Sequence, residues 1–70
     1  MNQPMTYEDT IKTYGAKAFN NLMEGGSGIY SPEIKNAIRT IATIYNVEYD
    51  KVFEDINKAE DANVKEYQNN

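Results

Sequence analysis

The residues with the most chemical potential are the carboxylic acids in the last third of the chain. From residue 50 onward they are Asp50, Glu54, Asp55, Glu60, Asp61 and Glu66. Paired carboxylates can act as general acid and base, hold a hard metal ion or attract a basic partner. The segment 50–61 lacks the alternating oxygen ligands and the central glycine of a calcium-binding loop, so we expect no metal site. The commoner reason for such charges is a solvated helix face. The alternatives are electrostatic steering toward a basic partner and mimicry of a phosphate backbone.

Other reactive residue types are scarce. The chain contains neither histidine nor cysteine, which removes imidazole bases, thiolate nucleophiles, disulfides and Cys/His zinc sites. Ser27 has no base near it in the sequence. The glycine-rich run 25–28 lacks the Gly-Lys-Ser/Thr ending of a phosphate-binding loop and follows no predicted strand. We therefore expect a protein that is not an enzyme and that binds no cofactor.

The charge balance bears on the class of partner. Eleven acidic residues against seven basic ones give a net charge of −4 at pH 7. Nucleic acids and anionic membranes are both bound mainly through positive charge, so this balance disfavours DNA and membrane surfaces. The sequence shows no signal-peptide pattern and no stretch long enough to span a membrane. We expect a cytoplasmic protein.

The segment 38–56 resembles a helix-turn-helix motif. Ala42 is the small residue within the first helix, and Asn46 is the turn residue four positions later. Val47 and Val52 supply the hydrophobes that follow. The resemblance implies a DNA-binding transcriptional regulator that acts as a dimer and places its second helix in the major groove.

The sequence departs from that motif at two positions. Asn46 stands where glycine is usual, and Asp55 stands where the motif has an apolar residue. The acidic side chains of the second helix would also repel phosphates. DNA binding would then require four basic side chains to converge on one face, namely Lys12, Lys17, Lys35 and Arg39.

Tyrosine supplies the remaining candidates for a contact surface. Tyr30 follows Ile29 just after the glycine-rich run, and both lie outside the apolar stripes of the predicted helices. Exposed tyrosine rings often anchor protein interfaces, which makes Ile29 and Tyr30 contact candidates. In the alternative interpretation they form an apolar staple that packs the loop onto the next helix.

Three helices must position these side chains. Thr6 and Asp9 have the spacing of a capping box, which begins a helix over 7–23. Apolar residues then recur every three or four positions. Gly15 in its middle indicates either a close approach of another backbone or a tolerated surface glycine.

The second and third helices follow after the glycine-rich run. Ser31 and Pro32 are typical of a helix start and predict a helix over 32–45, which Asn46 ends in the left-handed conformation. Its broad apolar surface predicts that it is the central helix of the bundle. A last apolar stripe predicts a helix over 49–62, with Lys–acid pairs at i, i+4 on the opposite face.

These elements predict an all-α fold, a compact three-helix bundle. We expect one domain over residues 1–70, with flexible ends at 1–5 and 65–70. A chain of this size buries a small core, so partners or a homodimer are compatible with it.

The function predicted from these patterns is that of a small acidic protein-binding module. Its partner is expected to be another protein with a basic surface. The expected contact residues are Ile29, Tyr30, Asp50, Glu54, Asp55 and Asp61. The alternative is the dimeric helix-turn-helix regulator.

Composition suggests a source. The chain has nine Asn, seven Ile, six Lys and six Tyr against one Leu and one Arg, which is typical of AT-rich coding genomes such as those of low-GC bacteria and their phages. This pattern favours a modulator or inhibitor of a host enzyme, including one that handles nucleic acid, encoded by a phage or mobile element.

Overall fold

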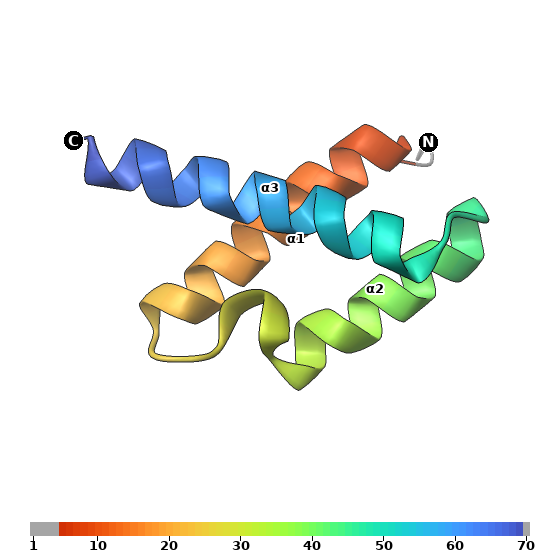
Figure 1. Cartoon of the computed structure of the whole chain (residues 1–70), viewed down its shortest axis with the longest axis horizontal. Helices are drawn as coiled ribbons and strands as arrows, with labels where there is room; N and C mark the ends of the chain where they lie inside the picture. The colour runs from red at the N-terminus through yellow and green to blue at the C-terminus, as the bar shows by residue number, and fades with distance from the viewer. Residues whose placement is uncertain (1–4, 70) are drawn as a thin grey trace.

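The fold is an all-α bundle of three helices, as the sequence predicts. The computed structural model describes residues 5–69, so the expectations for residues 1–4 and 70 lie outside it. Its elements are α1 (Tyr7–Met23), the short 3₁₀ helix η1 (Gly28–Tyr30), α2 (Pro32–Tyr45) and α3 (Tyr49–Gln68). Figure 1 shows α1 crossing α3, with α2 beneath them and η1 between α1 and α2.

Local capping explains where the helices begin and end. The hydroxyl of Thr6 accepts a hydrogen bond from the Asp9 amide at 3.1 Å, and the hydroxyl of Ser31 accepts one from the Ile34 amide at 3.3 Å. Asn46 ends α2 in the left-handed conformation, with φ 55° and ψ 48°. These three predicted caps are confirmed.

The core consists of aliphatic side chains from all four elements. Its buried members are Ile11, Ala18, Ile29, Ile34, Ile38, Ile41, Val52 and Ile56. Burial of this apolar surface supplies most of the stability of the bundle.

The prediction that α2 is the central helix is wrong. α1 and α3 pack most extensively on each other, and α2 contacts both of them less. Ile44, part of the apolar surface that suggested a central helix, is 68% exposed.

Gly15 lies at a close approach of α1 to α3. A Cβ atom at this position would collide with the Cβ of Ala59 and would lie 3.1–3.2 Å from the backbone of Ala59 and Glu60. Of the two interpretations of Gly15, the close approach is confirmed.

The third helix is longer than predicted, because it continues past residue 62 to Gln68. Three contacts accompany the extra turns. Lys65 pairs with Asp61 one turn earlier, the Asn63 amide donates to the Ala59 carbonyl, and the Tyr67 ring packs on Phe19 of α1 at a centroid distance of 6.0 Å. The Phe19 contact joins residues far apart in the sequence, which a local apolar pattern does not show.

The structure also bears on the membrane prediction. Within residues 5–69, no helix is both long enough and apolar enough to cross a membrane.

Candidate functional site

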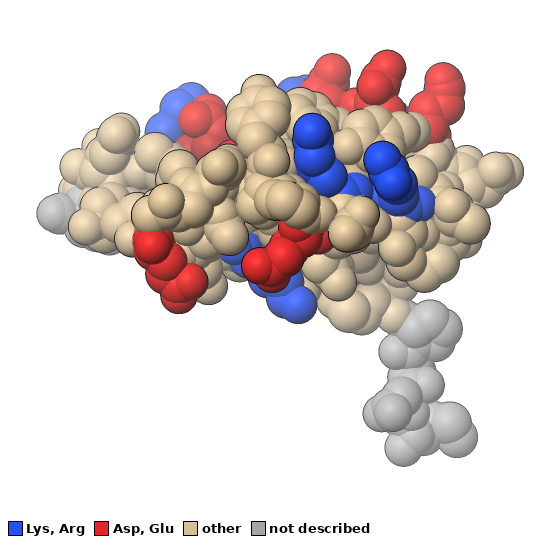
Figure 2. All heavy atoms as spheres, turned by 90° about the horizontal axis from the view of Figure 1, so that it is seen from below, with Lys and Arg blue, Asp and Glu red and all other residues tan. Residues whose placement is uncertain are grey.

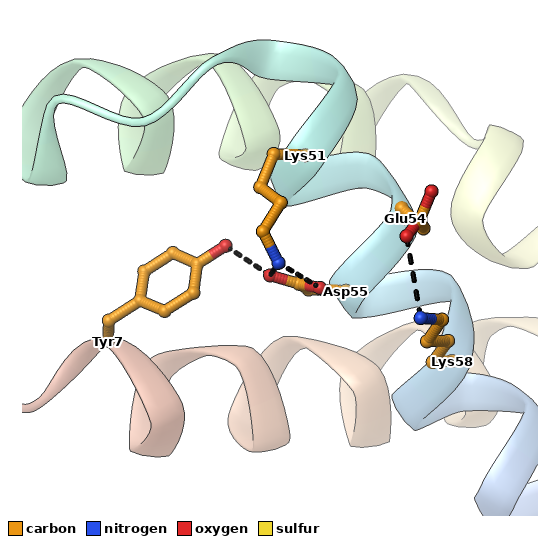
Figure 3. Close-up of polar contacts among 5 residues, drawn as sticks. All are labelled: Tyr7, Lys51, Glu54, Asp55 and Lys58. Atoms are coloured by element: carbon orange, nitrogen blue, oxygen red, sulfur yellow. Dashed lines mark hydrogen bonds and ion pairs between the residues drawn. The ribbon is translucent and has the colours of Figure 1, made fainter.

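Three of the six acidic residues of α3 pair with lysines one helical turn away. Lys51 pairs with Asp55 at 3.0 Å, Lys58 with Glu54 at 3.4 Å and Lys65 with Asp61 at 3.5 Å. Figure 3 shows the first two pairs. The two exposed pairs, Lys58–Glu54 and Lys65–Asp61, contribute about 0.3–0.5 kcal/mol each. Much of the acidic face predicted for α3 is therefore an alternation of both signs.

Asp55 is directed toward α1 and differs from the other predicted contact residues. It is half-buried and accepts hydrogen bonds from the Tyr7 hydroxyl at 2.7 Å and from the Lys51 ammonium at 3.0 Å (Figure 3). Partial burial raises the pKa of this carboxyl, but the bonds from Tyr7 and Lys51 outweigh it and hold the pKa below its usual value. The structure therefore assigns Asp55 to the α1–α3 contact, which corrects its expected place on an outer binding face.

The same contact changes the titration of Tyr7. Burial and the neighbouring Asp55 carboxylate raise the pKa of the Tyr7 phenol from 10.0 to about 12. Since the folded state favours the neutral phenol, the stability from this contact is complete below pH 10 and is lost as the pH rises through 12.

We expect the Tyr7 phenol to titrate later than an ordinary tyrosine. In an NMR titration of the tyrosine Cζ carbons, one resonance should have a midpoint near pH 12, and it should disappear in Tyr7→Phe. The Asp55→Asn variant should move the midpoint toward 10, because it removes the negative charge that opposes ionisation. An unchanged midpoint in Asp55→Asn would contradict this assignment.

Ile29 and Tyr30 are adjacent in η1 but lie in opposite environments. Ile29 is 2% exposed and belongs to the core, whereas Tyr30 is 64% exposed. A 3₁₀ helix turns about 120° per residue, so its neighbouring side chains diverge. Ile29 therefore packs into the core, as in the alternative interpretation in which an apolar staple holds the loop on the next helix. This burial corrects the prediction that Ile29 contacts a partner.

Tyr30 rests on Phe53 of α3, with the ring centroids 5.7 Å apart. Asp50 is exposed and precedes Phe53 by three residues, which places both side chains on neighbouring positions of the same side of α3. We call Tyr30, Phe53 and Asp50 the Tyr30 surface. Asp50 makes none of the ion pairs found within residues 5–69, so its charge is available to a partner.

Two of the four basic residues that DNA binding would require on one face, Lys12 and Lys17, line different hollows. Lys12 lines a hollow with Lys58 and Ala59 of α3, whereas Lys17 lines another with Glu33 of α2. In Figure 2 the face seen from below carries acidic and basic side chains interspersed among neutral ones.

The start of α3 is also unfavourable for phosphate contacts. Its first turns expose Glu48, Asp50 and Glu54, with Lys51 as the basic residue among them. This is the end of the helix that the helix-turn-helix resemblance directs toward DNA. A phosphate backbone at this end of the helix would meet three acidic side chains and one basic one.

Glu60 is expected among the solvated acids of α3, but its side chain is buried. Glu60 is 8% exposed, and its Oε2 atom has no hydrogen-bond partner. The spacing of Glu60 in the sequence indicates this burial, because Val52, Ile56 and Glu60 recur every four residues and so share the inward side of the helix.

The described residues offer no obvious metal centre. Within residues 5–69, no three acidic side chains come together as ligands for a metal ion would.

Together these features define a small all-α bundle with a tyrosine–phenylalanine contact exposed beside an acidic residue. Comparison of the chain with protein-family models, with curated proteins and with solved structures gives no match.

Proposed function

We propose that this chain is a small protein-binding module whose Tyr30 surface docks on a basic surface of another protein. The observation that carries the proposal is the position of Tyr30, which is 64% exposed yet packed on Phe53. A large ring held in place in the free protein loses little conformational entropy on binding, and such rings are frequent interface hot spots.

Charge supports a basic partner. The chain carries a net charge of −4, and Asp50 on the Tyr30 surface is exposed. A negative protein attracts a positive partner over a distance and raises the association rate at low salt.

The broader role that we propose is modulation or inhibition of a host enzyme in the cytoplasm. An enzyme that handles nucleic acid would present the basic surface that this module requires. The composition, rich in Asn, Ile, Lys and Tyr, supports an origin in a phage or mobile element.

Two matched variants test the proposal. Tagged wild-type, Tyr30→Ala and Tyr67→Ala chains are used to capture partners from a nuclease-treated host lysate, with elution in salt steps and mass spectrometry. Tyr67 is the control, because it is 59% exposed and also packs on a phenylalanine ring, that of Phe19.

We expect one protein to be retained by the wild type and by Tyr67→Ala and to be lost from Tyr30→Ala. For a hot-spot residue the affinity loss is about 2 kcal/mol or more, or roughly thirtyfold. Asp50→Lys should weaken binding most at low salt. Equal retention by Tyr30→Ala, or recovery of nucleic acid without a dominant protein, would overturn the proposal.

A further inference from the structure

Glu60 connects α3 to the segment that carries Tyr30. Its carboxylate lies against Gly28, where φ is +59° and where an added Cβ atom would collide with Glu60 Oε2. The segment 24–31 is also fixed from α1, because the Asn21 Oδ1 atom accepts a hydrogen bond from the Gly28 amide at 2.8 Å. Glu60 therefore touches the segment at the residue that enters η1.

The surroundings of Glu60 provide little compensation for a negative charge. Burial raises the pKa of its carboxyl, the Ile29 amide lowers it, and the nearby Asp61 charge raises it further. Asp61 lies on α3 itself. The contacts known here from η1 are Gly28 and the Ile29 amide, and from α1 Gly15 lies against the Glu60 backbone and the Ala18 carbonyl lies close to Gly28; none of these residues carries an ionisable side chain.

We propose that Glu60 is a pH-dependent switch for the segment 24–31. The neutral carboxyl keeps η1 packed on α3, and the carboxylate favours an open arrangement in which water reaches Oε2. Opening would expose Ile29, now 2% exposed, and would separate Tyr30 from Phe53. The switch would thus control whether the Tyr30 surface is assembled.

The direction of the pH dependence follows from the burial of the carboxyl. The packed state binds the proton more tightly than the open state, in which the carboxyl is hydrated and titrates near its ordinary value of 4.5. Raising the pH above that value shifts the equilibrium toward the open state. The equilibrium constant for opening rises up to about tenfold for each pH unit between the pKa of the open state and the pKa of the packed state. Above the pKa of the packed state it no longer changes.

Amide hydrogen exchange measures this opening directly. The Tyr30 amide donates to the Ser27 carbonyl at 3.1 Å and the Ser31 amide donates to the Gly28 carbonyl at 3.0 Å, so both are protected in the packed state. After correction for the intrinsic pH dependence of exchange, their protection should fall as the pH rises above 4.5. Amides in the middle of α3 should not follow this trend.

The Glu60→Gln variant should remove the pH dependence, because its side chain has a similar shape and does not ionise in this range. Glu66→Gln is the control, since Glu66 is exposed on the same helix. Constant protection in the wild type, or the same trend in Glu60→Gln, would overturn the proposal.

A second measurement needs no variant at the switch. In the wild type, the Glu60 Cδ resonance should titrate above 4.5, and the fall in protection at Tyr30 and Ser31 should level off at the pH where that resonance has its midpoint. A fall in protection that continues well above that midpoint, or ends well below it, would refute the coupling. The experiment uses the chain without a partner, so its failure leaves the capture result for Tyr30→Ala unaffected. Only the effect of the switch on binding rests on the proposed function.

Discussion

Replacing Ile29 with alanine should lower the free energy of unfolding by about 2–5 kcal/mol. The side chain is 2% exposed and fills space between η1 and the helices, so its removal leaves a cavity. A domain of 70 residues has a total stability of about 4–10 kcal/mol. We therefore expect a large fall in the urea midpoint of the helical circular dichroism signal.

Tyr30→Ala provides the contrast from the adjacent position. Because Tyr30 is 64% exposed and packs mainly on Phe53, its removal should cost about 0.5–1.5 kcal/mol. Equal losses from the two variants would show that both residues are structural, and the binding role of Tyr30 would then lose its basis.

Gly15→Ala should destabilise the bundle, although alanine is normally the better helix former. The exchange gains about 1 kcal/mol of helix propensity. The added Cβ atom meets the Cβ and backbone of Ala59, which have no freedom to rotate away, so α1 and α3 must separate. Overpacking of this kind costs about 1–3 kcal/mol, and we expect a net loss in urea unfolding.

Ala59→Gly tests the cause of that loss. In the Gly15→Ala background it removes the opposing Cβ and should recover part of the lost stability, whereas in the wild type it should only destabilise. Ala16→Gly serves as the control for the propensity difference between alanine and glycine, because Ala16 is exposed on α1, the helix that carries Gly15. A stabilising Gly15→Ala would contradict the close approach of the two helices.

The features that could be predicted from the sequence are those that neighbouring residues determine. Thr6, Ser31 and Asn46 act on backbone groups a few residues away, so the starts of α1 and α2 and the end of α2 follow from local chemistry. The lysine pairs of α3 are equally local, since both members lie on one helix.

The features that could not be predicted depend on which helices meet. Asp55 is oriented by Tyr7, which lies 48 residues away in the sequence, and the last turns of α3 pack on Phe19. The apolar surface of α2 suggested a central helix because periodicity shows which residues are apolar but not which partner covers them. The same limit left the environments of Ile29 and Tyr30 undecided.

The extensive packing of α1 on α3 has a consequence for the order in which the chain acquires its structure. The first helix finds its main partner in the last one, so the contact must close a loop that includes η1 and α2. During synthesis, α1 emerges before that partner exists and keeps much of its apolar face in water. We therefore expect the nascent chain to gain a stable core only when α3 has left the ribosome, with folding as one late and cooperative event.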